Sequence, residues 1–152
     1  MDGDQLTTQA TTANQTLVIE RVINAPREIV WSALTDQAHA EEWWAPKGCI
    51  VIQLQMDVRP GGSWQKCMRT PTGDEVCNGG VYREVERPEQ LAFTYAVHER
   101  ETLVTFTLVE HEGKTRLTLR QSAFESVADR DSHREGWTST IGRLAEYLAD
   151  RS

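Results

Sequence analysis

The sequence lacks three features that would assign it to particular classes of protein. It has no run of about 20 apolar residues, so we expect no membrane-spanning helix. Its N-terminal segment has no basic stretch followed by an apolar one, so we expect no secretory signal and a cytoplasmic location. Lys and Arg are scattered among acidic residues, and the formal net charge is −7 over 152 residues. Because nucleic acid is bound by clustered cations, we expect no nucleic-acid partner.

Cysteine and histidine are too few and too dispersed to suggest a metal site. The four histidines show no spacing typical of metal ligands. We therefore expect no metal ion, unless distant strands bring ligands together, and we expect no cofactor. Cys49, Cys67 and Cys77 form no Cys-x-x-Cys pair, and one of them is left over in any disulfide scheme. We expect all three to be free thiols in a reducing cytosol.

The first part of the chain changes from a polar segment to a strand. Residues 1–16 are polar and rich in Thr and Gln, and they offer little apolar surface to stabilise an ordered structure. This composition predicts a flexible tail ahead of a single domain over residues 17–152. The apolar, β-branched run at residues 17–23 predicts the first strand of that domain.

Two short helices are predicted after this strand. Pro26 fits the first turn of a helix, where its missing N–H has no partner to lose, and Asn24 or Ala25 would be the N-cap. Asp36 would then cap a second short helix that ends before Pro46.

Beyond residue 49, apolar and polar residues alternate with a period of two, which predicts strands. The residues that would share one face of the first of these strands are Ile50, Ile52, Leu54, Met56 and Val58. Further strands are predicted at residues 63–69, 76–85, 91–97, 102–109 and 115–122. The paired Gly79 and Gly80 predict a bulge or a sharp bend in a strongly curved strand.

The C-terminal residues form one apolar stripe with helical spacing. The stripe consists of His133, Trp137, Ile141, Leu144 and Leu148, and it predicts a helix over roughly residues 125–149. The order of elements is a strand, two short helices, six strands and a long helix. We therefore predict an α+β fold in which a seven-stranded curved antiparallel sheet wraps around the C-terminal helix.

A sheet that bends around one helix is expected to leave a pocket lined by large aromatic side chains. Lys66, Asn78 and Gln121 fall on the same strand faces as the inward aromatic residues, and a buried lysine needs a partner or an anion. Two simpler interpretations remain open: the aromatic residues form plain core, and Lys66 extends to solvent. The predicted ligand-binding residues are Trp44, Trp64, Lys66, Met68, Asn78, Tyr82, Phe93, Tyr95, Phe106, Gln121, Trp137 and Ile141.

Six segments in order resemble a known family. They are RVINAPREIVWSALTD, WWAPKG, DVRPGGSW, GVYREVERPEQLAFTY, TLVTFTLVEHEGKTRLTL and GWTSTIGRLAEYL. Over residues 17–149 the chain resembles the SRPBCC superfamily, which has the START-like or helix-grip fold, and within it the branch of heat-shock-protein-90 ATPase activator homologues. The resemblance implies a hydrophobic cavity between sheet and C-terminal helix, which the superfamily uses for lipids and other apolar molecules. It carries no universal catalytic motif onto this sequence.

The resemblance also suggests different roles for two adjacent tryptophans. Neighbours on a helix lie about 100° apart, so Trp43 and Trp44 cannot share one narrow face. We expect Trp43 to anchor the second short helix against the sheet. Trp44 would face the cavity entrance near the turn at residues 59–62, as a wall or lid. The alternative is that both indoles are packed as structure.

Three classes of function remain, and we favour a non-catalytic carrier or sensor of a small hydrophobic or amphipathic molecule, as a monomer or homodimer. A cyclase or dehydratase on the same scaffold would need a titratable group in the cavity, for which Lys66, His133 and Tyr82 are candidates. Cys67 and Cys77 would lie on the opposite strand face, with no base nearby. A co-chaperone-like interaction module would need an exposed apolar patch, which the amphipathic pattern does not predict.

Overall fold

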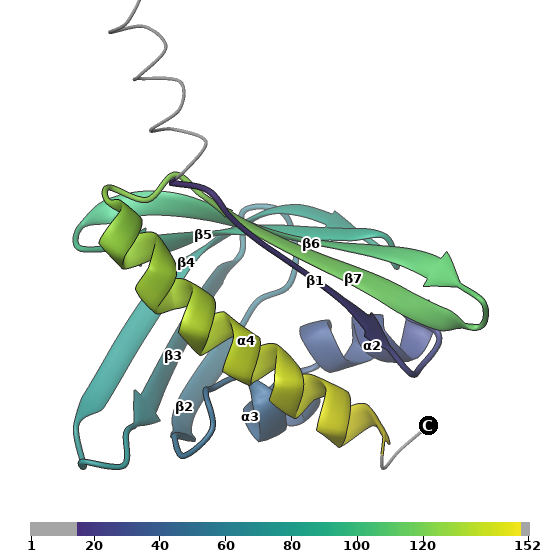
Figure 1. Ribbon diagram of the computed structural model, residues 1–152, viewed down its shortest axis with the longest axis horizontal. Coiled ribbons are helices and arrows are strands. Elements are labelled where there is room, and N and C mark those ends of the chain that lie inside the picture. The colour runs from purple at the N-terminus through teal and green to yellow at the C-terminus, as the bar shows by residue number, and fades with distance from the viewer. Residues whose placement is uncertain (1–14, 150–152) are drawn as a thin grey trace, which may run out of the picture.

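Seven antiparallel strands form one curved sheet, and a long helix lies across its concave side (Figure 1). The computed structural model describes residues 15–149. In chain order the elements are β1 (Leu17–Ile23), α2 (Arg27–Thr35), α3 (Gln37–Trp43), β2 (Ile50–Met56), β3 (Ser63–Arg69), β4 (Glu75–Glu86), β5 (Gln90–Val97), β6 (Arg100–His111), β7 (Lys114–Ser122) and α4 (Val127–Ala149).

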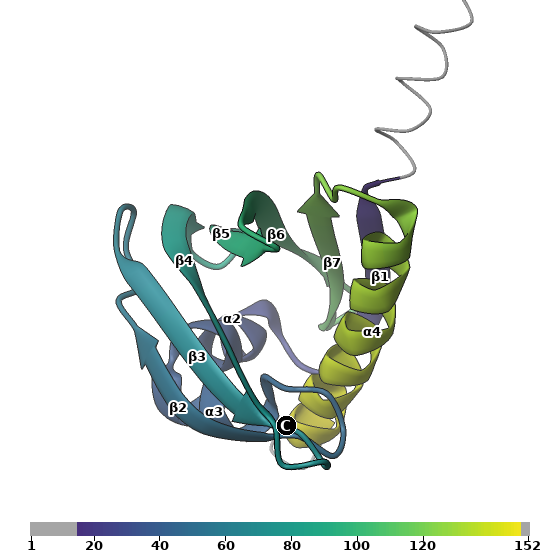
Figure 2. The same cartoon turned by 90° about the vertical axis from the view of Figure 1, so that its left-hand side faces the viewer.

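The strand order across the sheet is β1-β7-β6-β5-β4-β3-β2, so β2 to β7 form a meander and β1 pairs with β7. Figure 2 shows α4 beside β1 at the opening of the curved sheet, with α2 and α3 packed against each other at one end. The predicted α+β helix-grip architecture is confirmed. The predicted flexible tail falls mostly on residues 1–14, which lie outside the described residues, and it stays a prediction.

The predicted cap of the first helix is wrong, whereas that of the second is confirmed. Pro26 itself is the N-cap of α2, in an extended conformation, and no side chain caps this helix. Its carbonyl accepts the first helical hydrogen bond, from the Val30 N–H, so neither Asn24 nor Ala25 occupies the cap position. Asp36 caps α3, because its carboxylate accepts a hydrogen bond from the Ala38 N–H at 3.1 Å.

Strand β2 does not present the single apolar face that its sequence predicts. The pairing with β3 shifts register between Val51 and Gln53. An irregularity of this kind moves the residues before it to the other face of the sheet. Ile50, before the shift, is 62% exposed, and Ile52, within the shift, is 38% exposed, while Leu54 beyond it is buried.

The bulge predicted at the paired glycines does not form in the pairing with β3. Pairing of β3 with β4 continues in register through Gly79 and Gly80, and the register of β4 shifts later, at its pairing with β5. Gly80 instead allows close packing. A Cβ at this position would lie 1.9 Å from the Thr94 carbonyl oxygen and 2.7 Å from Nε1 of Trp64. That indole donates a hydrogen bond of 3.0 Å to the same carbonyl oxygen.

Two of the three cysteines form a disulfide, which corrects the expectation of three free thiols. Cys67 on β3 lies directly opposite Cys77 on β4, with the Cα atoms 4.0 Å apart, and the sulfur atoms are bonded. The two residues are placed symmetrically about the turn between the strands, so strand pairing brings them together. Cys49 is the free cysteine of the described chain.

Candidate functional site

A cavity of about 200 Å³ lies between strands β3 to β5 and the first half of α4. Period two places Lys66 and Met68 on one face of β3, and the register sets Asn78 and Val76 of β4 directly opposite them. The cavity is lined by Trp44, Pro46, Lys66, Met68, Val76, Asn78, Tyr95, Ser132, His133, Gly136, Trp137 and Thr140. Six of these are predicted site residues: Trp44, Lys66, Met68, Asn78, Tyr95 and Trp137.

Five predicted site residues lie in the aromatic and aliphatic core, away from the lining of this cavity. These are Trp64, Tyr82, Phe93, Phe106 and Ile141, and all are at most 2% exposed. The ring centroid of Phe93 lies 5.4 Å from that of Trp64, 5.8 Å from that of Tyr82 and 6.2 Å from that of Phe106. Aromatic pairs at such distances stabilise a core. These side chains therefore form the core that packs behind the residues lining the cavity.

Gln121 is buried and joins the core to the cavity wall. Its Oε1 accepts a hydrogen bond of 2.8 Å from Nε1 of Trp137, and its Nε2 donates one of 2.9 Å to the Thr102 hydroxyl. Because both ends of the amide are paired with protein groups, Gln121 orients the Trp137 indole at the cavity.

The two adjacent tryptophans are both buried, with their ring centroids 6.4 Å apart in a stacked arrangement, so neither lies at an exposed entrance. Nε1 of Trp43 donates a hydrogen bond of 2.9 Å to the Ala33 carbonyl oxygen, which fixes α3 to α2. Trp44 is 4% exposed, and its ring centroid lies 5.0 Å from that of Trp64 and 5.8 Å from that of Phe93. Trp44 is therefore a wall between the core and the cavity.

Lys66 is buried, with 4% of its surface exposed, so it does not extend to solvent. Its ammonium donates a hydrogen bond of 3.2 Å to the Trp44 carbonyl oxygen and lies 4.8 Å from the centroid of the Trp44 ring. Within residues 15–149, no carboxylate lies within 4.0 Å of it. Burial lowers the pKa of Lys66 to about 8, an effect partly offset by the charge interaction with Cys49.

Three further polar groups border the cavity. Asn78 Oδ1 and Trp44 Nε1 are buried and have no hydrogen-bond partner among the described residues. Burial raises the pKa of the Tyr95 hydroxyl to about 12, so this group stays protonated near neutral pH. The cavity therefore combines apolar walls with unpaired polar atoms that a bound molecule could satisfy.

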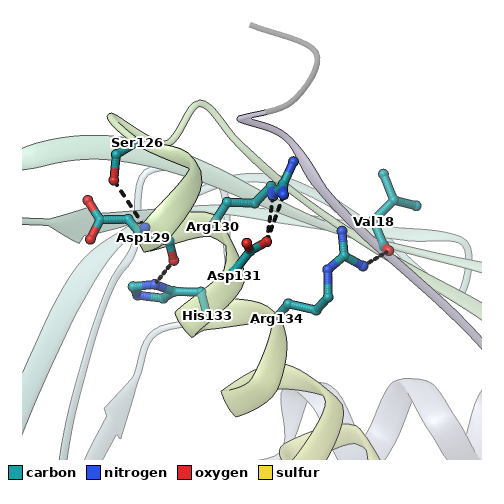
Figure 3. A network of polar contacts seen from close by, with 7 residues as sticks. All are labelled: Val18, Ser126, Asp129, Arg130, Asp131, His133 and Arg134. Atoms are coloured by element: carbon teal, nitrogen blue, oxygen red, sulfur yellow. Dashed lines mark hydrogen bonds and ion pairs between the residues drawn. The ribbon is translucent and has the colours of Figure 1, made fainter. Parts of the chain in front are cut away.

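His133 is held in one tautomer at the start of α4 (Figure 3). Its Nδ1 lies 2.9 Å from the Asp129 carbonyl oxygen, which can only accept a hydrogen bond. The Nδ1 atom therefore carries the proton, and Nε2 of the neutral ring has the lone pair. The hydroxyl oxygen of Ser126 accepts from the Asp129 N–H, as an N-cap residue does, and Arg134 donates to the Val18 carbonyl oxygen of β1.

Sequence reasoning missed Arg143, which holds the loop that carries Trp44. Its guanidinium donates to the carbonyl oxygens of Ala45, Pro46 and Cys49 at 2.9, 3.3 and 3.2 Å. It also donates to the Glu42 carbonyl oxygen at 3.0 Å. A lone arginine beside the apolar stripe of a helix gives no sequence signal of this role.

A larger hollow of about 410 Å³ lies on the opposite face of the sheet, over β4 to β7. Arg83, Glu84, Gln90 and Glu101 contribute to its lining. It is bordered mainly by polar and charged side chains, so the aromatic cavity remains the better candidate site. Within residues 15–149 no cluster of His, Cys, Asp and Glu could hold a metal ion. The described helices include none that is long and apolar enough to cross a membrane.

A curved antiparallel sheet that grips a long C-terminal helix, with an aromatic cavity between them, defines a helix-grip protein. The chain belongs to the Activator of Hsp90 ATPase homolog 1-like protein family, whose model matches residues 24–149. This result confirms the resemblance found in the sequence. The match covers most of the chain and includes every residue that lines the cavity.

Solved structures of similar proteins share the fold along nearly the whole chain. The AHSA1 protein of Silicibacter pomeroyi is 28% identical, with 90% of this chain and 99% of that chain covered and a TM-score of 0.81. A protein of Nitrosomonas europaea is 27% identical, with coverages of 91% and 97% and a TM-score of 0.80. No curated protein matches the chain in sequence.

Proposed function

We propose that the cavity binds a small hydrophobic or amphipathic molecule and that the protein acts as its carrier or sensor. The observation that carries this proposal is a buried lysine on the wall of a largely apolar cavity, with no carboxylate partner in the part of the chain that the structure describes. Burial of an unpaired ammonium is costly, and an anionic group on a ligand would offset that cost. Trp44, Tyr95 and Trp137 would cover the apolar part of the same molecule.

The cavity size favours a compact ligand. Pockets for drug-sized molecules measure roughly 300–1,000 Å³, whereas this one measures about 200 Å³. A molecule with one ring and a short side chain fits that space better than a long-chain lipid. The ligand class that combines the size, the aromatic walls and the cation is a small aromatic carboxylate or phenolate.

Calorimetric titration with phenylacetate and its alcohol, 2-phenylethanol, tests this function. We expect the acid to bind more tightly, because only the acid pairs with Lys66. Lys66→Met should remove the preference for the acid and keep the apolar binding. The matched control is Lys47→Met, because Lys47 is 72% exposed and lies outside the cavity. Equal affinity of the wild type for acid and alcohol would remove Lys66 from recognition, and no binding of either would contradict the function.

The wall residue Trp44 should act mainly on ligand release. Trp44→Ala opens one side of the cavity, so we expect faster dissociation of phenylacetate in stopped-flow measurements. Trp44 also packs on Trp64 and Phe93, so unfolding should be measured in parallel. An unchanged dissociation rate would assign Trp44 to the core alone.

The cellular context of this proposal comprises a cytoplasmic location and a monomer or homodimer. The disulfide bears on the location, because such bonds are rare in a reducing cytosol. Fractionation of the native host cells, followed by thiol labelling of the protein without prior reduction, tests the location and the bond together. Analytical ultracentrifugation tests the oligomeric state.

A further inference from the structure

Lys66 differs from every other lysine of the chain in its surroundings. The sequence contains three lysines, of which Lys47 and Lys114 are exposed and Lys66 is buried. Among the described residues, the Lys66 amine is held by the Trp44 carbonyl oxygen and the face of the Trp44 ring. Neither group carries the negative charge that would keep the amine protonated at high pH, and the interaction with Cys49 only partly offsets the effect of burial. The amine therefore borders the cavity in a setting that favours its neutral, nucleophilic form.

We propose that Nζ of Lys66 forms an imine with a small apolar aldehyde or ketone that enters the cavity. The proposal rests on the proposed function, because it uses the same cavity, and it adds a covalent step. The lone pair of the neutral amine attacks the carbonyl carbon, and the carbonyl oxygen takes up a proton. The nitrogen then loses its protons as the oxygen leaves as water, so amine and carbonyl compound give imine and water. No oxidant or reductant is needed.

The surroundings of the amine match the requirements of this reaction. An amine of pKa about 8 is neutral in roughly a tenth of molecules at pH 7, against fewer than about one in a thousand for an exposed lysine. Two groups that line the same cavity, one on β5 and one on α4, can exchange protons with the departing oxygen. They are the hydroxyl of Tyr95 and the imidazole of His133, whose Nε2 has the lone pair.

The cavity also selects the carbonyl compound. Trp44 and Trp137 border it with flat aromatic surfaces, and its volume of about 200 Å³ limits the guest to a compact molecule. The expected substrates are therefore single-ring aromatic aldehydes and ketones.

Reductive trapping of the full-length protein tests the proposal. The protein is incubated with benzaldehyde and sodium cyanoborohydride at neutral pH, and the modified lysines are identified by peptide mass mapping. We expect Lys66 to be labelled at least about ten-fold faster than Lys47 and Lys114, because a larger fraction of its amine is neutral. Lys66→Arg keeps a cation and removes the reactive amine, so the fast adduct should vanish. Lys47→Arg should leave it unchanged.

Benzyl alcohol separates failure of the imine from failure of the cavity, because it has the same ring without a carbonyl group. Its binding to the wild type and to Lys66→Arg is measured by NMR titration. Binding of benzyl alcohol without an adduct at Lys66, or equal labelling of the three lysines, would overturn the imine and leave the proposed function intact. Absence of both binding and adduct would overturn both proposals.

Discussion

Replacement of Lys66 by methionine tests whether the buried amine destabilises the folded protein. Methionine has a similar length and no charge, so it fills the same space without the desolvation cost of an ammonium. At pH 7 most of the Lys66 amine is protonated and has no carboxylate partner. We therefore expect Lys66→Met to be at least as stable as the wild type at pH 7.

The difference between the two proteins should depend on pH in a defined direction. The pKa of Lys66 falls from 10.5 in the unfolded chain to about 8 in the folded protein. Between these values the unfolded chain binds more protons, so the stability of the wild type rises with pH. From pH 7 to pH 9.5 this single group contributes about 2 kcal/mol. The advantage of Lys66→Met should shrink by that amount.

Urea unfolding of both proteins at pH 7 and at pH 9.5, followed by tryptophan fluorescence, measures this change. The other titrating groups are common to both proteins, so their effects cancel in the difference. A constant difference between the two pH values would show that the Lys66 amine titrates like an exposed lysine. That result would refute both its burial and the basis of the imine proposal.

Three further changes should lower the free energy of unfolding, as measured by urea titration. Gln121→Leu leaves the buried indole N–H of Trp137 without a partner, so we expect a loss of about 2 kcal/mol. An unchanged urea midpoint would show that water takes the place of Gln121 as the hydrogen-bond acceptor. Gly80→Ala forces a Cβ into a backbone oxygen of the next strand, so we expect a loss of about 3 kcal/mol or more. Full stability of that variant would contradict the packing described for β4. Cys77→Ser opens the link to Cys67 across a separation of 10 residues, so we expect a loss of roughly 2–3 kcal/mol. No loss relative to the unreduced wild type would show that the bond does not form.

The sequence predicts the element order and the topology because both depend on local periodicity. Alternation of apolar and polar residues locates the strands, and apolar residues at steps of three and four locate α4. The exposure of Ile50 and Ile52 could not be read in the same way, because a register shift depends on the partner strand. Gly80 shows the same limit: a glycine signals special geometry, and only the Trp64 indole reveals that the geometry is a close contact.

The candidate site was predictable in part, for similar reasons. Alternation along β3 correctly put Lys66 and Met68 at the cavity, since it needs no knowledge of other strands. It could not distinguish cavity-lining aromatic residues from those beneath, because both point inward. The sequence places His133 on the stripe of α4 as a candidate titratable group, but nothing in its sequence context indicates the backbone oxygen that fixes its tautomer. The pairing of Cys67 with Cys77 was visible in principle, from their equal distance to the turn.

The contacts of Arg143 mark one side of the cavity as different from the rest. The sheet side is fixed by strand pairing, whereas the loop after α3 is attached to α4 by polar contacts. Arg143 donates to four backbone oxygens, the Lys47 N–H donates to the Ser139 hydroxyl oxygen, and the Lys47 ammonium pairs with Glu146. Water can replace hydrogen bonds of this kind as they break, but it cannot replace apolar packing. The loop after α3 can therefore separate from α4 without disturbing the strands. We expect guest molecules to enter and leave between them.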